Sequence, residues 1–496
     1  MFTIVGESNK LVPKLFYGLL LEVKKVKKII LNISLMLALT CSITTINNAQ
    51  QRLPRTDVAP SKTPQANNGG ANNLNYSLGE EVLVSNNQDG GALRCEPSAA
   101  IFKDTVIVAW NDSYGGAHGS PTGVAVGWAI SKDRGKTFKF GGYLPESQPA
   151  FLPSGADSWL AADAAGNFYL QVLSWQKSSH HIQLYYMDKS NLGKWRKMTD
   201  ARTLDVSKGY LDKPAMAVDR DKRIGIVYTE EKEGSPIISF SLSSNRGQSW
   251  SKPFQVSASS KTQKTGASVS MRGNQIVVSW MEGGGLALNE VWYVMSKDGG
   301  RSFTAPSMIY RLKEPVQSPK GYALGVGPSA FISNNTWLTN APAGNGNTTF
   351  YLTLAEGVGK GSRVLLFALT TDTNVWSKPV QIEAISSNPL SVFPSLSMAG
   401  KIPALLYYHR NDAANSEMDV YLSLLPKNKN FQNIKVNTVS TDWAKVSGDK
   451  QYAPIQRNFG DYITLASYNN VFVAAWTDGR QGVPRIYARV LEIKSK

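Results

Sequence analysis

The feature that most constrains the fold is an eight-residue pattern that returns along the chain. Its form is Ser-x-Asp-x-Gly-x-Ser/Thr-Trp/Phe, and close copies begin at Ser131, Ser243 and Ser296. In such a segment the Asp or Asn side chain accepts hydrogen bonds from backbone N–H groups of a turn, and the Gly supplies a positive φ. These segments are therefore expected to tie hairpins together and to take no part in catalysis. Weaker copies lie at Asp188 to Trp195 and at Thr371 to Trp376.

Two further repeats divide the chain into units of similar length. One marks the start of a unit and reads Glu96-Pro97-Ser98-Ala99 in its first copy, and later copies begin at Lys213, Gly327 and Phe393. The other is a buried strand that ends in an aromatic residue, such as Val106 to Trp110. Internal repeats of this kind predict an array of small sheets. Seven unit starts can be counted, near residues 97, 157, 214, 267, 328, 394 and 461, and six is the alternative if the second or fifth unit is miscounted.

The expected fold is all-β, a single β-propeller over residues 78–496. The last unit, Tyr462 to Ile493, holds only three strands, and the segment Glu80 to Asn86 supplies a spare strand before the first unit. Pairing these two segments would close the ring and remove its exposed strand edges.

The repeated pattern resembles the Asp box of the sialidase or BNR-repeat superfamily. The resemblance covers roughly residues 78–496 and extends to two phrases, Asp212 to Asp219 and Phe459 to Tyr462, which look like those of secreted bacterial members. It implies a propeller whose Asp boxes lie between the third and fourth strands of each blade. Asp boxes are specific for the fold and say little about function.

The first 49 residues are expected to be a signal peptide. Four lysines between Lys24 and Lys28 precede an apolar run from Ile29 to Ile46, and Asn47-Asn48-Ala49 offers a small-residue cleavage site. A transmembrane anchor is the alternative, but Asn32, Ser34 and Thr40 interrupt the run. Residues 50–77 are rich in Pro, Asn, Gln and Gly, as in a flexible linker. The mature protein is expected to be secreted or periplasmic, monomeric and free of the membrane.

Charge and cysteine content narrow the class of partner. The net charge is +16, and the basic excess persists after residue 49, which favours a polyanionic partner. After residue 49 there is no polybasic run and no aromatic–basic nucleic-acid motif, so an acidic polysaccharide is expected and nucleic acid is not. Only Cys95 remains after the expected cleavage, and the four His show no metal-binding spacing. We therefore expect no intramolecular disulfide, no bound metal ion and no cofactor.

Ligands of propellers bind on the face opposite the Asp boxes, where the loops between second and third strands lie. All four His fall on or beside these expected loops, which include Asn111 to Gly123, Ser174 to His181 and Ala341 to Thr348. His118 lies in a Gly-rich loop able to present its side chain to a ligand. Several cations are expected on the same face as substrate-binding groups, namely Arg410, Arg457, Arg480 and Lys264.

Three functions remain open at this point. The loop after Trp110 and the His distribution look similar to seven-bladed ulvan lyases of marine bacteria, which implies β-elimination on a uronate-containing polysaccharide. His118 would then act as base or acid with Tyr186 as its partner, Arg202 would neutralise the uronate carboxylate, and His181 would assist. A sialidase is the second reading, although its Phe-Arg-Ile-Pro motif is absent. A non-catalytic glycan-binding propeller is the third.

Overall fold

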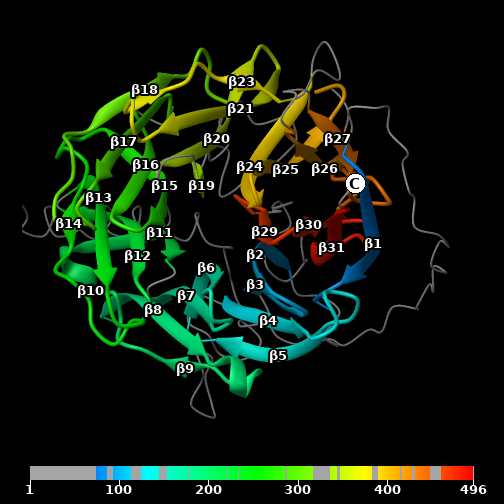
Figure 1. Ribbon diagram of the computed structural model, residues 1–496, viewed down its shortest axis with the longest axis horizontal. Helices are drawn as coiled ribbons and strands as arrows, with labels where there is room; N and C mark the ends of the chain where they lie inside the picture. The colour runs from blue at the N-terminus through cyan, green and yellow to red at the C-terminus, as the bar shows by residue number, and fades with distance from the viewer. Residues whose placement is uncertain are drawn as a thin grey trace, which may run out of the picture.

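The computed structural model describes residues 74–85, 93–112, 124–144, 154–176, 178–219, 222–232, 234–284, 288–316, 336–342, 347–382, 389–413, 416–426, 431–446 and 460–494. They form antiparallel sheets arranged in a ring around a central channel (Figure 1). No helix among these residues is both long and apolar enough to cross a membrane.

Consecutive strands form meanders, which we number as units in chain order. Unit 1 holds β2 (Arg94–Phe102), β3 (Thr105–Asp112), β4 (Ala125–Ser131) and β5 (Lys139–Leu144). Unit 2 holds β6 (Ser154–Ala162), β7 (Phe168–Trp175), β8 (Ser179–Met187), the 3-10 turn η2 (Lys189–Asn191), β9 (Arg196–Lys197) and β10 (Arg202–Asp205), and is followed by the turn η3 (Val206–Lys208). Unit 3 holds β11 (Gly209–Val218), β12 (Ile224–Lys232), β13 (Ser235–Ser243) and β14 (Phe254–Gln255). Unit 4 holds β15 (Gln263–Arg272), β16 (Gln275–Gly283), β17 (Glu290–Ser296) and β18 (Ser307–Arg311).

The remaining strands complete the ring. Unit 5 holds β19 (Trp337–Pro342), β20 (Thr348–Val358), β21 (Gly361–Thr370), β22 (Val375–Trp376) and β23 (Val380–Gln381). Unit 6 holds β24 (Leu390–Ala399), β25 (Ile402–Arg410), β26 (Glu417–Leu424), β27 (Gln432–Lys435) and β28 (Thr441–Asp442). Unit 7 holds β29 (Thr464–Tyr468), β30 (Val471–Asp478), β31 (Arg485–Ile493) and, from the start of the chain, β1 (Tyr76–Leu83).

Units 5 and 6 are hydrogen-bonded into one ten-stranded sheet, but only through a single parallel pairing of Ser362 with Leu390. Divided at this bridge, the sheets give the seven meanders that the sequence favoured, and undivided they give six. The number of blades thus depends on how one bridge is counted.

The N-terminal strand closes the ring, as expected from the sequence. β1 pairs antiparallel with β31, from Tyr76 opposite Ile493 to Leu83 opposite Tyr487. The strand begins four residues before the expected Glu80. Joining the two ends of the ring leaves unit 7 with four strands and covers an edge that would otherwise be open.

The Asp boxes lie between the third and fourth strands and define what we call the box face. In the first box, Gly135 N donates to Ser131 Oγ at 2.8 Å, and Thr137 N donates to Asp133 Oδ1 at 2.9 Å. Equivalent bonds recur in the boxes that start at Ser243 and Ser296. The opposite side, where first strands begin and second strands end, is the loop face.

One register expectation was wrong. The first described strand of unit 5 is β19, and its Asp-box remnant follows β21, so β21 is the third strand. The connection from Ala341 to Thr348 therefore joins the first and second strands on the box face. The turn between second and third strands is the tight one at Gly359-Lys360. The expected unit start at Gly327 lies outside the described residues.

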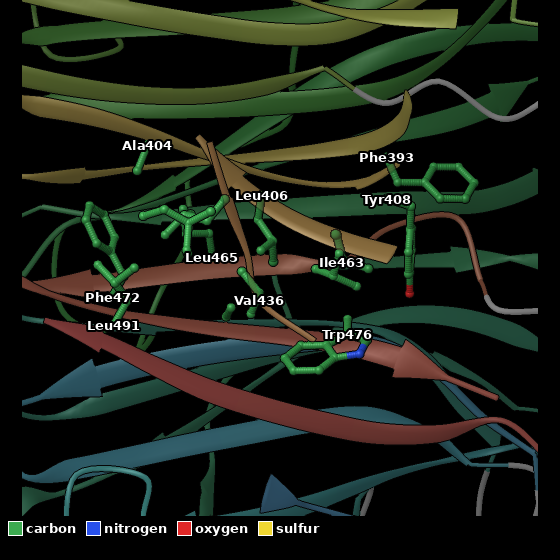
Figure 2. Packing of buried hydrophobic residues seen from close by; sticks show 14 of the residues in the cluster. Phe393, Ala404, Leu406, Tyr408, Val436, Ile463, Leu465, Phe472, Trp476 and Leu491 are labelled. Carbon is green, nitrogen blue, oxygen red and sulfur yellow. The ribbon is translucent and has the colours of Figure 1, made fainter. Parts of the chain in front are cut away.

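Hydrophobic cores fill the spaces between neighbouring units. Figure 2 shows one of them, where Leu406 and Tyr408 of unit 6 approach Leu465, Phe472 and Trp476 of unit 7. The aromatic residues that recur in the second strands, including Tyr228, are fully buried, as the repeat predicted.

The first Asp box should leave a signature in the pH dependence of stability. Burial pulls the pKa of Asp133 upwards, but hydrogen bonds from Thr137 and Ser131 outweigh it and lower the pKa to about 2. Because its pKa is lower in the folded state, ionised Asp133 stabilises the fold at pH values above its unfolded pKa near 4. This contribution to the free energy of unfolding is lost as the pH falls towards 2. We expect Asp133→Asn to flatten the loss of unfolding free energy between pH 4 and pH 2, measured by urea denaturation. Equal slopes in wild type and variant would contradict this.

Candidate functional site

The first strands of the units line the central channel, and most of them carry the same irregularity near their start. The register shifts in β2, β6, β11, β15 and β24, and each shift contains a residue with positive φ. These residues are Glu96, Asp157, Lys213, Gly266 and Phe393. Positive φ costs a non-glycine residue about 1–3 kcal/mol and concentrates at functional sites. The bulges coincide with the unit-start repeat found in the sequence.

Three of the strained residues are charged, and they meet at the loop-face end of the channel. The Lys213 ammonium lies 3.1 Å from Asp461 Oδ2 and 3.5 Å from Asp157 Oδ2. All three side chains are at least nine-tenths buried. With Glu96 and Asp212, they form what we call the mouth cluster, drawn from units 1, 2, 3 and 7.

Glu96 organises the cluster from the side of unit 1. Its carboxylate accepts a bond of 2.6 Å from Asn111 Nδ2 and one of 2.9 Å from the backbone N–H of Asp461. Asn111 Oδ1 in turn accepts from the N–H of Asp157 at 3.0 Å. Gly460, with φ of 86°, packs so closely on Glu96 that a Cβ at this position would overlap its side chain. These bonds fix the two aspartates relative to one another.

The electrostatics of the cluster shift the pKa values of Lys213 and Asp212. Burial opposes the charge of Lys213, but Asp157, Asp461, Asp212 and Glu96 outweigh it and hold the Lys213 pKa well above its ordinary value. Burial raises the pKa of Asp212 to about 7. The positive charge of Lys213 opposes this rise, and the negative charge of Asp157 adds to it. Asp212 keeps partial exposure at the surface of the cluster. A carboxyl that is half protonated at neutral pH is able to donate a proton there.

A cavity of about 20 Å³ adjoins the cluster, lined among others by Asp157, Lys213 and Tyr462. This volume holds one water molecule. The Tyr462 hydroxyl and Asp157 Oδ2 are buried there without a hydrogen-bond partner among the described residues. Two polar atoms facing a cavity of this size fit a bound water.

Stacked indole rings form the floor of the mouth. Trp159 of β6 and Trp337 of β19 lie with ring centroids 4.6 Å apart, although they come from units 2 and 5. Both rings line the small cavity and also a larger one of about 300 Å³ between the first strands. The stack thus sits between the mouth cluster and the channel below it.

The cations expected to bind substrate on the loop face are largely engaged by the protein. Five second strands carry an acid two residues after the core position, and each acid pairs with a cation: Asp112 with Arg94, Glu230 with Arg202, Glu282 with Lys264, Glu356 with Arg363 and Asp478 with Arg480. Arg480 also pairs with Glu81 of β1. Arg202, Lys264 and Arg480 are therefore parts of a recurring structural ion pair.

The other expected site residues do not assemble into one sector. His181 Nδ1 lies 2.9 Å from Asp200 Oδ2 and its Nε2 lies 2.7 Å from Ser179 Oγ, near the loop-face end of β8. Tyr186 is five residues further along the strand, about 16 Å away, where its hydroxyl donates to Asp188 Oδ2 on the box face. The structure thus separates Tyr186 from His181 and Arg202. Arg410 is buried at the end of β25, and His118 and Arg457 lie outside the described residues.

The mouth cluster itself was missed from the sequence, although a signal for it was present. Lys213 and Asp461 stand in the two phrases that carry the superfamily resemblance, and these phrases meet in space. Within the described part of the chain, no group of three His, Cys, Asp or Glu side chains is placed to hold a metal ion.

Comparison with known proteins identifies the fold. No protein-family model matches the sequence, and no curated protein matches it. Among solved structures, an ulvan lyase of polysaccharide lyase family 25 has a TM-score of 0.50 at 9% identity, over 82% of this chain and 95% of that chain. An α-L-arabinofuranosidase from Fusarium graminearum has a TM-score of 0.46 at 12% identity, over 84% and 98%. A sialidase from Trypanosoma rangeli has a TM-score of 0.42 at 9% identity, over 81% and 54%. The likeness to the ulvan lyase concerns the fold alone and agrees with the β-propeller that the Asp boxes predicted.

Proposed function

We propose that the protein is a carbohydrate-active enzyme, and that it hydrolyses a neutral glycan at the mouth cluster. The observation that carries this proposal is the gathering of four carboxylates around one buried ammonium, next to a cavity with room for one water. Paired carboxyl groups in different electrostatic environments are what glycoside hydrolysis requires.

Asp212 is the general acid in this proposal. With its pKa raised to about 7, it carries a proton over much of the range below neutrality and can give it to the leaving glycosidic oxygen. Among the five residues of the mouth cluster, Asp212 is the one that keeps partial exposure, so in this proposal it is the one that a glycan contacts.

Asp157 is the base. Asp157 lines the water-sized cavity, and a water held between its Oδ2 atom and the Tyr462 hydroxyl would lose a proton to Asp157 as the water oxygen attacks the anomeric carbon. The bond to the leaving oxygen breaks as Asp212 protonates it, so that one water is consumed per bond cleaved. Lys213 holds Asp157 and Asp461 in position.

The charge of the mouth favours neutral substrates over uronates. Four acids surround a single ammonium, and the cations nearby on the loop face pair with protein carboxylates. A uronate polymer would meet like charge at this site. The ulvan-type lyase expected from the sequence needs a cation free for the uronate, and Arg202 is paired with Glu230.

One experiment separates the three readings. The protein is incubated with neutral and acidic polysaccharides, including ulvan, while new reducing ends and the ultraviolet absorbance of unsaturated uronyl ends are both followed. We expect reducing ends without absorbance on a neutral polymer, falling about 10²–10⁴-fold in Asp157→Asn and unchanged in His118→Ala. Absorbance on ulvan that vanishes in His118→Ala would establish the lyase and refute the hydrolase. Binding without any product would indicate a glycan-binding propeller.

The expected export of the chain agrees with this proposal. A polymeric glycan is met outside the cytoplasm, and the first 49 residues have the charge and hydropathy pattern of a signal peptide. N-terminal sequencing of the protein recovered from the culture medium or periplasm tests this part, with a new N-terminus near Gln50 as the expected result.

A further inference from the structure

Unpaired cations gather on the box face of unit 2, away from the mouth cluster. A groove of about 440 Å³ lies beside the end of β8 and is lined by Lys194, Arg196 and Arg246 among others. None of these three side chains makes an ion pair within the part of the chain that the structure describes. They contrast with Arg202, Lys264 and Arg480 of the loop face, which are all neutralised.

Hydrogen-bond donors inside the groove also lack partners. Trp195 is more than nine-tenths buried, and its indole N–H has no acceptor among the described residues. The Nε–H of Arg246 is buried and lacks an acceptor as well. Both donor atoms are covered by protein, so contact with a ligand in the groove is left to the charged ends of Lys194, Arg196 and Arg246.

The single acid of the groove is already occupied. Asp188 accepts from the N–H and the hydroxyl of Ser190 through Oδ1, and from the Tyr186 hydroxyl through Oδ2. No ion pair joins it to the groove cations among the described residues, although the charge of Arg246 helps to lower the pKa of Asp188. Three positive charges against one hydrogen-bonded carboxylate leave the groove with a net positive potential.

From these contacts we propose that the groove binds an anionic polysaccharide through its sulfate or carboxylate groups. The volume exceeds that of a lone anion, and the cations come from separate segments: Lys194 from the loop before β9, Arg196 from β9 itself and Arg246 from the Asp box of unit 3. Arg196 lies 5.3 Å above the Tyr186 ring and covers one of its faces, which disfavours stacking of a nucleic-acid base. The exposed large hydrophobic side chains of the described residues do not line the groove, which disfavours a membrane surface.

The chain contains a matched control for the groove arginine. Arg134 holds the same Asp-box position in unit 1 that Arg246 holds in unit 3, with φ of 61° against 62°. Arg134, however, pairs with Asp104 at 3.1 Å and approaches Glu492. Arg134→Gln and Arg246→Gln change the net charge alike at equivalent backbone positions, but the first removes a surface ion pair and the second a groove cation.

The test is binding of the full chain to heparin, a sulfated and uronate-containing polymer, by isothermal titration calorimetry. Arg196→Gln and Arg246→Gln should each weaken binding about tenfold or more, as expected for a lost charge-assisted hydrogen bond, and Arg134→Gln should leave it unchanged. Neutral dextran should not bind, and inorganic sulfate should compete only at a far higher sulfate concentration than heparin itself supplies. Circular dichroism checks that each variant is folded.

Three results would overturn the proposal. An equal loss in Arg134→Gln would mean that heparin responds to net charge alone. Competition by inorganic sulfate at matched sulfate concentration would reduce the groove to a site for a small anion. Single-stranded DNA that binds as tightly as heparin, with the same dependence on Arg196 and Arg246, would reassign the groove to nucleic acid. The groove and the mouth cluster share no residue, so none of these results bears on the proposed hydrolysis.

Discussion

Replacing Lys213 with Met is expected to lower the free energy of unfolding by about 3–5 kcal/mol at pH 7. The ammonium lies among four carboxylates, and Met removes its charge while filling much of its volume. Asp157 and Asp461 would then stay buried with no counter-charge, and breaking a buried ion pair in this way costs several kcal/mol. Urea denaturation followed by tryptophan fluorescence measures the loss.

The pH dependence of this loss identifies its origin. Without Lys213, the buried acids take up protons more readily in the folded state, so the stability of the variant falls as the pH rises from about 4 towards 7. In the wild-type protein the Lys213 pKa is raised, so the charged lysine stabilises the fold throughout the neutral range and is lost only at strongly alkaline pH. The gap between variant and wild type should therefore be small near pH 4 and large at pH 7.

Lys445→Met provides the matched control. Lys445 pairs with Asp442 at 3.0 Å, but its side chain is 83% exposed. An exposed pair contributes little to stability, so the denaturation midpoint of this variant should equal that of wild type. If Lys213→Met also left the denaturation midpoint unchanged, the carboxylates of the mouth cluster would have to be hydrated. That result would contradict their burial.

The sequence predicted the fold because its strongest signals are local. An Asp box specifies its own turn within eight residues, since the Ser131 and Thr137 hydroxyls both donate to Asp133 and the Gly135 N–H donates to Ser131. The closing strand was also predictable, because a three-stranded last unit requires a partner. Unit 5 was misread because a segment such as Trp337 to Ala341 has the same pattern whether it is the first or the second strand.

The site was harder to predict because its contacts join distant segments. Lys213 and Asp461 are brought together only when unit 7 closes beside unit 1. Arg480 resembles a free surface cation in the sequence, yet its partner Glu81 lies at the other end of the chain. A charged side chain that has no evident partner in the sequence can therefore form an ion pair once the ring of units has closed.

Replacing Asp212 with Asn should have a different effect from replacing Lys213 with Met. We expect a large loss of activity without a loss of stability. The proton donor to the leaving oxygen is gone, which should lower kcat about 10²–10⁴-fold on a natural glycan. An aryl glycoside with an acidic phenol as leaving group needs little protonation, and its cleavage should be largely preserved. The matched variant Asp205→Asn, at an exposed position in the same part of the chain, should keep full activity on both substrates.

The pH profile makes the assignment specific to Asp212. The wild-type rate should fall as the pH rises through about 7, where the active protonated carboxyl ionises, and Asp212→Asn should lack this alkaline limb. A raised folded-state pKa means that the folded protein binds the proton more tightly than the unfolded chain, so ionised Asp212 opposes folding above pH 7. Asn cannot ionise, and the variant should be at least as stable as wild type above pH 7.

Two results would contradict the assignment of Asp212. If Asp212→Asn kept the alkaline limb of the pH profile, another carboxyl of the mouth cluster would be the general acid. If Asp212→Asn lost stability together with activity, Asp212 would have a structural role like that of Lys213. A catalytic acid is expected to reduce the stability of the folded protein, so replacing it should not destabilise the fold.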